Sequence, residues 1–486
     1  MLKQGIKLTE AQERTRTWAL RTEQTIGCGA IGARVGVGKT LMALSLTMHD
    51  AFSRPKERDL YVVPPTLQDQ WIVEAERLTT LKAVLCPRYI DDLLFAQLYA
   101  RSDIHMIVLS YKTLLRAPPT SIIFKIKWKR IIADEAHCMS NAQSQTTQKA
   151  LLLEAHFRWA VSGTLMTNQP KDLYGISLFL RYISSYPAFQ KALATGRLMR
   201  EMVTQSTKED IAKLELKNLI SKDIIVEMLP KEKLLYDHMR RSIKRTMITR
   251  KSDGMKRLQA GVFELLNRLR TAASNIHLTT DPRNWASPSV EGGPEVHLAM
   301  MQKKGSKTLR VLEVISDIRE RYPNAKILLF SNFLSIIDNY QEEISRRFPN
   351  DGPPIVYNGK VPRQKRHQLV EFFKTSTAKE CRVMILGFKC GNAGINLQCA
   401  THVILNEPFW NQSLEQQAIA RAYRKGQTED VYAYRMLTKD TIDQRILRIA
   451  ARKQQQIDTV LAGKPASATQ AADKLSTAEM DYLLEP

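Results

Sequence analysis

A glycine-rich turn between a strand pattern and a helix pattern constrains the fold of this chain more than any other feature. Residues Ala33–Thr40 read AxxGxGKT, after the short run Thr25–Ile31 and before the helical spacing of Thr40–Met48. Gly36 and Gly38 let a loop wind closely around phosphates, with backbone N–H groups pointing inward and a helix N-terminus adding positive charge. A chance glycine-rich turn is the alternative, and the strand–helix setting disfavours it. The motif therefore predicts an α/β fold with a phosphate site.

Four residues are candidates for the chemistry at this site. Lys39 is expected to reach the β- and γ-phosphates, and Thr40 to bind Mg²⁺. Asp134 follows the apolar run Ile131–Ala133, where a second Mg²⁺ ligand is expected at the end of a buried strand. Glu135 can orient and deprotonate the attacking water. Acid pairs are common on surfaces, so the prediction depends on the strand-end position.

Two arginines near the end of the chain are candidates for charge stabilisation. Arg421 and Arg424 are three residues apart in the segment Gln417–Gln427. On a helix, that spacing places both guanidinium groups on one face, where they suit a γ-phosphate in its charged transition state. A solvated basic helix face is the alternative. The flanking glutamines and the nucleotide motif elsewhere in the chain favour the catalytic interpretation.

The order of apolar runs predicts two α/β lobes with parallel sheets and a helical insertion between them. The expected strands are Leu60–Val63, Met106–Leu109, Arg130–Ala133, Phe157–Val161, Ala325–Ser331, Pro354–Tyr357, Val383–Leu386 and His402–Leu405. The expected helices include Gln68–Leu78, Leu334–Arg347 and Arg363–Phe373. We expect lobe 1 over residues 1–182, a mostly helical protrusion and linker over 183–304, lobe 2 over 305–452 and a flexible tail over 453–486, with one helix at Ala478–Leu484.

Composition narrows the range of partners. The 486 residues carry 72 Lys and Arg against 49 Asp and Glu, a net charge of +23. Such an excess favours a polyanion such as nucleic acid, although many basic proteins bind nothing in particular. The sequence has neither an apolar run of eighteen residues nor an apolar segment near Met1, and its six cysteines are scattered. An intracellular location, nucleus or cytoplasm, with reduced thiols is expected.

Many motifs together resemble the Swi/Snf-type DNA-translocating ATPases of helicase superfamily two. The match runs from about Leu8 to about Ile446 and differs from DEAH-box RNA helicases in the last arginine motif. The motifs that carry it, in family order, are VVPPTLQDQW (Val62–Trp71), VLSYKTL (Val108–Leu114), DEAHCMSN (Asp134–Asn141), SGTLMTNQPKDLYG (Ser162–Gly175), LLFSNF (Leu328–Phe333), YNG (Tyr357–Gly359), GNAGINL (Gly391–Leu397), EPFWN (Glu407–Asn411), RAYRKGQ (Arg421–Gln427) and TIDQRIL (Thr441–Leu447).

The resemblance implies two RecA-like lobes that bind ATP and Mg²⁺ between them. It implies that Gln12 reads adenine, that Gln417 belongs to the catalytic arginine motif, and that four residues couple ATP hydrolysis to movement on nucleic acid. These coupling residues are His137, Ser162, Gly163 and Thr164. Leu165 stands where relatives usually have proline, which would stiffen this loop. No departure removes a phosphate ligand or an arginine, so an active ATPase is expected.

Candidate nucleic-acid contacts fall into two sets. The segment Met239–Arg257 holds eight Lys and Arg in nineteen residues, although a solvated charged helix is the alternative. Small polar groups at strand ends suit phosphate oxygens, and Trp410 could stack on bases or lie in a core. The candidates are Arg240, Arg241, Lys244 and Arg245 from the basic segment, and Thr66, Ser110, Tyr111, Ser331, Asn332, Asn392 and Trp410 from the strand ends.

The expected function is a DNA-dependent ATPase that moves along double-stranded DNA without full strand separation, remodelling protein–DNA complexes or assisting transcription. Three alternatives remain open: a strand-separating DNA or RNA helicase, an ATPase subunit of viral transcription, and an interaction subunit with a vestigial motor. A forked-duplex assay distinguishes the first, and a phosphate-release assay the last. Transcription or chromatin proteins are possible partners, and no membrane partner is expected.

Overall fold

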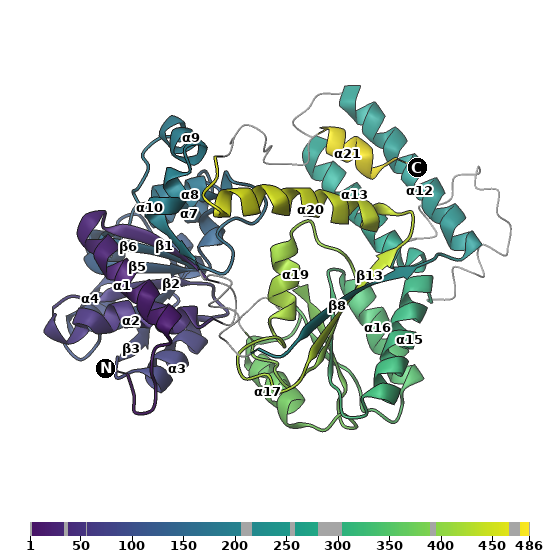
Figure 1. Ribbon diagram of the computed structural model, residues 1–486, viewed down its shortest axis with the longest axis horizontal. Helices are drawn as coiled ribbons and strands as arrows, with labels where there is room; N and C mark the ends of the chain where they lie inside the picture. The colour runs from purple at the N-terminus through teal and green to yellow at the C-terminus, as the bar shows by residue number, and fades with distance from the viewer. Residues whose placement is uncertain are drawn as a thin grey trace. The chain divides into compact units, whose positions relative to one another are not determined.

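The computed structural model describes residues 2–33, 37–54, 56–205, 216–252, 258–279, 304–388, 395–465 and 477–485. These residues form two compact units. Unit 1 comprises Met1–Glu215 and Lys453–Asp473, and unit 2 comprises Leu216–Arg452 and Lys474–Pro486. Each unit contains one sheet of parallel strands with flanking helices (Figure 1). The predicted fold class, α/β with two parallel sheets, is therefore confirmed. No helix in the described ranges is long and apolar enough to span a membrane.

The sheet of unit 1 has the described strand order β3-β4-β2-β5-β6-β1-β7. Parallel pairing places the carboxyl ends of β5, β6 and β1 side by side at one edge of the sheet, where ligands bind in folds of this kind. The strands are β1 (Cys28–Gly32), β2 (Asp59–Val63), β3 (Ala83–Leu85), β4 (Met106–Ser110), β5 (Lys127–Asp134), β6 (Glu154–Ser162) and β7 (Val203–Gln205).

Helices cover both faces of this sheet because its strands carry apolar residues on both sides. Tyr61 and Val63 point to the face covered by α1, α2 and α3, whereas Leu60 and Val62 point to the core beneath α5, α7 and α8. The helices are α1 (Glu10–Thr25), α2 (Lys39–Asp50), α3 (Gln68–Leu78), α4 (Asp92–Ala100), α5 (Tyr111–Arg116), α6 (Ile122–Lys125), α7 (Gln145–Leu151), α8 (Asp172–Phe179), α9 (Tyr186–Ala194) and α10 (Arg197–Met202), with the 3-10 turns η1 (Ala51–Ser53) and η2 (Ala136–Met139).

The sheet of unit 2 has the described order β10-β11-β9-β12-β13-β8 and is also parallel. Its strands are β8 (Leu219–Val226), β9 (Ile327–Ser331), β10 (Ile355–Tyr357), β11 (Val383–Gly387), β12 (His402–Leu405) and β13 (Val431–Thr438). One face packs on α15 (Ser306–Arg321) and α16 (Leu334–Arg347), and the other on α17 (Arg363–Thr375) and α19 (Gln412–Ile419). A further core joins α12 (Pro230–Ser252), α13 (Leu258–Ser274) with the turn η3 (Ile276–Leu278), α20 (Ile442–Leu461) and α21 (Thr477–Leu483).

The unit boundaries differ from the expected domains. The expected helical region also contains two strands: β7 pairs with β1 of unit 1, and β8 pairs with β13 of unit 2. Both strands were missed because their partners lie far away in the sequence and β8 is largely exposed, so neither shows a buried apolar run. Residue 453 is not the start of a flexible tail, since α20 continues to Leu461. The expected final helix is observed as α21.

Candidate nucleotide-binding site

The phosphate loop connects β1 to α2, as the sequence predicts. Gly38 is the N-cap of α2 and has a φ of 88°, a left-handed conformation that favours glycine. A Cβ atom there would lie 2.4 Å from Gln12 Nε2, so a larger residue would displace the Gln12 side chain. Lys39 and Thr40 open the helix. Gly36 lies outside the described residues.

The Gln12 side chain on α1 is hydrogen-bonded to the phosphate loop. It is buried, its Oε1 accepts from Thr9 N at 2.9 Å, and its Nε2 donates to Val37 O at 3.0 Å. The first bond belongs to a capping box at the start of α1, so the same side chain fixes a helix end and the loop. The expected adenine contact stays a prediction.

Asp134 ends β5 in a buried position close to the phosphate loop. Its Oδ2 accepts from Trp71 Nε1 at 2.8 Å, and its Oδ1 accepts from Glu135 N at 2.9 Å. Burial, with the charge of Glu135, raises its pKa from 3.8 to about 6, while the positive charge of Lys39 acts in the opposite direction. Each carboxylate oxygen keeps a lone pair, so this carboxylate and the Thr40 hydroxyl fit Mg²⁺, a hard cation that prefers oxygen ligands.

This raised pKa predicts a pH-dependent stability. Below about pH 4, Asp134 is protonated in the folded chain and in the unfolded chain. Between pH 4 and 6 only the folded chain retains the proton, so the free energy of unfolding decreases by about 3 kcal/mol as the pH rises through this range. Asp134→Asn removes that decrease.

The measurement is denaturant unfolding of both chains without nucleotide from pH 4 to 8. The exposed Asp69→Asn serves as the control. Parallel pH curves for the original chain and Asp134→Asn would contradict the assignment.

Glu135, His137 and Ser162 form one cluster beside Asp134. Glu135 has a φ of 48°, which turns the chain sharply after β5. His137 Nδ1 lies 3.2 Å from Glu135 Oε2 and 3.2 Å from Ser162 Oγ, and Ser162 Oγ donates to Thr164 O at 2.9 Å. Burial of the ring opposes its protonation, but the hydrogen bond and charge of Glu135 raise the pKa of His137. The cluster therefore connects the candidate base to the predicted coupling loop, which also contains Gly163.

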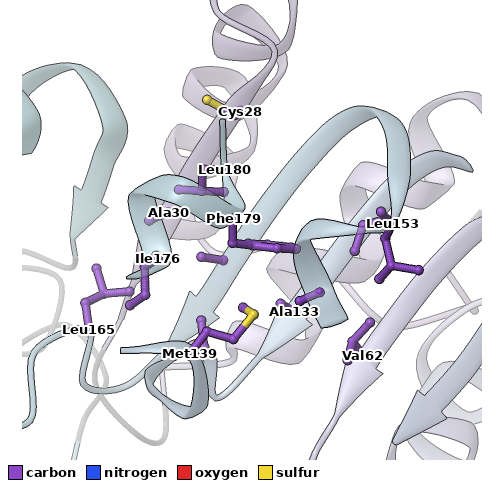
Figure 2. Packing of buried hydrophobic residues seen from close by; sticks show 14 of the residues in the cluster. Cys28, Ala30, Val62, Ala133, Met139, Leu153, Leu165, Ile176, Phe179 and Leu180 are labelled. Atoms are coloured by element: carbon purple, nitrogen blue, oxygen red, sulfur yellow. The ribbon is translucent and has the colours of Figure 1, made fainter. Parts of the chain in front are cut away.

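The loop after Ser162 is fixed by a buried carboxylate that sequence reasoning left without a role. Asp172 Oδ2 accepts from Thr167 N, Asn168 N and Gln169 N at 2.9, 2.7 and 3.2 Å. Leu165 is 3% exposed and packs in the core of unit 1 near Met139 and Ile176 (Figure 2). Leu165 thus anchors the loop by burial.

Helix α8 lies very close to the turn η2 that follows Glu135. A Cβ atom on Gly175 would lie 2.0 Å from Met139 O, so only glycine permits this approach. The packing fixes the predicted coupling loop and the DEAH turn to each other within unit 1.

Two expected nucleic-acid contacts in unit 1 are buried. Ser110 caps α5 by accepting from Thr113 N at 3.0 Å, and the Tyr111 hydroxyl donates to Asp134 O at 2.9 Å. Their exposures of 3% and 5% correct the expectation of direct contact, since phosphates cannot reach these side chains. Both residues instead position the ends of β4 and β5. Thr66 is exposed at a strand end, as expected.

Arg421 and Arg424 lie in turns beyond a helix, which corrects the expectation that they share a helix face. Helix α19 ends at Ile419, and Gly426 has a φ of 94°. Gln427 fixes the turn, because its Nε2 donates to the carbonyls of residues 398, 400 and 422 at 3.0, 3.1 and 3.2 Å. Arg421 is buried and Arg424 half-buried.

Gln417 lies on α19 and is buried, with 4% exposure. Because the side chain is buried, its amide is held in one position close in sequence to the two arginines. Its assigned catalytic role stays a prediction.

A fully buried carboxylate organises the strand ends of unit 2. Glu407 Oε1 accepts from Ser331 Oγ at 2.9 Å and from Asn406 Nδ2 at 2.7 Å, and Glu407 Oε2 accepts from Asn332 N at 3.0 Å. Ser331 is completely buried, which corrects its assignment to phosphate contact. Asn332 is half-buried, and its Nδ2 has no hydrogen-bond partner among the described residues. Asn392 lies outside the described residues.

Trp410 packs inside unit 2 against a buried cation. The guanidinium of Arg270 on α13 lies 5.7 Å from the Trp410 ring and 5.4 Å from the Phe333 ring, and its Nη2 donates to Pro408 O at 3.1 Å. This contact supports the packing interpretation of Trp410, whose side chain is only partly buried, and stacking on bases stays a prediction. Arg270 was missed because one arginine in a basic helical segment gives no signal of burial.

The basic helix α12 exposes part of its charge. Arg241, Lys244 and Arg245 are exposed, as a nucleic-acid surface requires. Arg240 is different, because its side chain is 11% exposed, lies 3.2 Å from Asp237 and donates to Glu485 O.

The comparisons identify the family. Residues 11–278 match the family model of the SNF2-related domain, and residues 306–426 match that of the helicase conserved C-terminal domain. The chain belongs to the SNF2-related family. These are the domains of an ATP-hydrolysing, helicase-like enzyme, as the resemblance implies.

Relatives of this SNF2-related chain include bacterial and viral proteins. An "Uncharacterized ATP-dependent helicase" of Mycoplasma pneumoniae is 26% identical, with 93% of this chain and 42% of the relative covered. A "Probable global transactivator" of Orgyia pseudotsugata multicapsid polyhedrosis virus is 27% identical, with 89% and 86% covered. The chain thus spans less than half of the bacterial relative. The SWI2/SNF2 ATPase core of Sulfolobus solfataricus, solved in complex with dsDNA, has 20% identity, 99% and 97% coverage and a TM-score of 0.41.

Proposed function

We propose that this chain is a nucleic-acid-stimulated ATPase that translocates on double-stranded DNA. One observation carries the proposal: Asp134 and the phosphate loop lie together at the carboxyl edge of a parallel sheet, with Glu135 and its hydrogen-bonded cluster beside them. The SNF2-related domain that contains these residues supports ATP as the nucleotide.

Each residue at this edge has a role that its chemistry permits. Lys39 and the loop amides bind the phosphates, while Thr40 and Asp134 hold Mg²⁺, which neutralises phosphate charge. Glu135 orients the attacking water, with its carboxylate fixed by His137 and Ser162. Arg421 and Arg424 stabilise charge on the γ-phosphate in the transition state.

Nucleic acid is proposed to contact exposed groups of both units. Thr66 in unit 1, and Asn332 and the exposed cations of α12 in unit 2, are polar or positive and accessible in part. No base-reading element is recognised in the sequence, so binding is expected to depend on phosphates, to be sequence-tolerant and to weaken with salt.

Duplex DNA is expected to stimulate the ATPase several-fold more than RNA of equal length. The double variant Arg241→Glu with Lys244→Glu should reduce stimulation at subsaturating DNA at least tenfold, because each charge reversal replaces attraction to phosphate by repulsion. Phosphate release measures both effects, and Arg310→Glu on α15 is the control. Greater stimulation by RNA would instead indicate an RNA-acting enzyme.

A role in transcription is the second candidate function. The viral relative named a global transactivator is covered over 86% of its length, which favours this candidate over a chromatin role. A forked-duplex assay separately tests the strand-separating helicase, since pure translocation leaves the strands paired. Release of a stalled polymerase from DNA by the chain and ATP would support transcription.

A further inference from the structure

Segment 477–485, which contains α21, docks on α12 and on the part of α20 that belongs to unit 2 (Figure 1). Leu483 and Leu484 are 0% and 2% exposed in the core that these helices share, with Tyr236 and Ile446 in the same core. The apolar side chains thus hold the segment in one place, and some of its polar groups contact the neighbouring helices.

Four arginines contact this short segment. On α20, Arg445 Nη1 donates to Leu483 O at 3.1 Å and Arg448 Nη1 donates to the Tyr482 hydroxyl at 3.1 Å. Arg452 pairs with the carboxylate of Glu479, whose side chain is 12% exposed. On α12, Arg240 donates to Glu485 O. An acidic segment therefore lies against a basic face. Arg240 and Arg445 are largely buried beneath it, whereas Arg448 and Arg452 remain exposed at its side.

Arg445 is the most buried of these cations. Burial, and the nearby charge of Arg240, lower the pKa of Arg445, while Tyr236, Tyr482 and Glu485 act in the opposite direction. Neutral carbonyl oxygens compensate a guanidinium less than charged oxygens do. A phosphate oxygen would therefore be a stronger acceptor for Arg445 than the Leu483 carbonyl that it contacts here.

We propose that Arg240, Arg445, Arg448 and Arg452 form a phosphate-binding face, and that segment 477–485 occupies part of this face when nucleic acid is absent, because it covers Arg240 and Arg445 and pairs with Arg452. The exposed Lys244 lies one turn after Arg240 on α12, on the same helix face. The inference rests on the proposed function, because it takes the phosphate to be that of nucleic acid.

Competition between the two occupants has a reciprocal consequence. Nucleic acid that uses the covered arginines must displace the segment. The factor by which the docked segment lowers the affinity for nucleic acid therefore equals the factor by which bound nucleic acid weakens docking of the segment, and a variant with weaker docking should bind nucleic acid more tightly. The segment would thus limit binding to nucleic acid that offers enough phosphates.

The first experiment weakens the segment in the full chain. Leu483→Ala with Leu484→Ala removes its apolar anchor, whereas Glu479→Gln leaves the core intact and removes one ion pair. Both variants should bind duplex DNA at least threefold more tightly. The slope of log affinity against log salt should steepen by about 0.9 for each added phosphate contact. Glu313→Gln, which loses an exposed charge on α15, is the matched control. Unchanged or weaker DNA binding by Glu479→Gln would overturn the inference.

The second experiment needs no variant, so a folding defect cannot obscure it. Amide hydrogen exchange of residues 479–485 is measured in the unaltered chain with and without duplex DNA. DNA should accelerate exchange there by releasing the segment, and unchanged or slower exchange would contradict the proposal.

The charge reversal at Arg241 and Lys244 distinguishes the two proposals. If the charge reversal leaves DNA binding unchanged, the DNA contact that the proposed function assigns to α12 is refuted. If it weakens binding while the variants of the segment bind as the original chain does, only the covered face is refuted.

Discussion

Lys39→Ala is expected to abolish ATP turnover while leaving DNA binding largely intact. Lys39 opens α2 directly after Gly38, and its charge acts on the buried Asp134. A lysine in this position neutralises the β- and γ-phosphates, so its loss removes both nucleotide binding energy and transition-state stabilisation. The measurement is phosphate release at saturating duplex DNA, together with the DNA affinity of the same preparation.

Lys125→Ala is the matched control, since Lys125 is exposed at the end of α6 in the same unit. It should retain full turnover. Normal turnover by Lys39→Ala would remove the phosphate loop from the mechanism and, with it, the central assignment of the proposed function.

Arg424→Ala should lower kcat by about 10³ with little change in nucleotide affinity, because an arginine finger acts on charge that develops in the transition state. The expectation applies although Arg424 lies in a turn and not on a helix. Only its access to the γ-phosphate during turnover matters. Single-turnover hydrolysis and equilibrium binding of a nucleotide separate the two effects.

The adjacent Lys425→Ala is a close control, since Lys425 is exposed in the same turn and carries the same charge. A loss that is equal in both variants would indicate a general effect of positive charge, and an unchanged kcat for Arg424→Ala would exclude the finger.

The segment docked on α20 should make the measured rates depend on salt concentration. If the covered arginines compete with DNA as proposed, basal and stimulated rates should respond differently to salt. Comparisons among variants are therefore best made at one salt concentration.

Several elements could be predicted from sequence because their signals are local. The helices Gln68–Leu78 and Leu334–Arg347 and the strand His402–Leu405 are observed with the predicted bounds. Strands buried on both faces are continuous apolar runs, and amphipathic helices repeat every three to four residues. The positions of Lys39 and Asp134 follow from the same logic, since Asp134 ends a strand and Lys39 opens the helix that follows another strand.

Other features depend on partners far away in the sequence. The pairing of β8 with β13 joins residues about 212 positions apart, and Arg270 meets Pro408 across 138 positions. Ser110 and Tyr111 resemble surface contacts in the sequence, but burial assigns them to packing. The turn that holds Arg424 is fixed by Gln427, whose bonds reach two carbonyls on another loop.

The sequence alone determined the fold class, the phosphate loop and the family resemblance, because each depends on residue types at short spacings. Only the tertiary structure decided which polar residues are exposed and which arginines contact segment 477–485. Burial and hydrogen bonding between distant segments arise when the chain is packed, and no local pattern of residues encodes them separately.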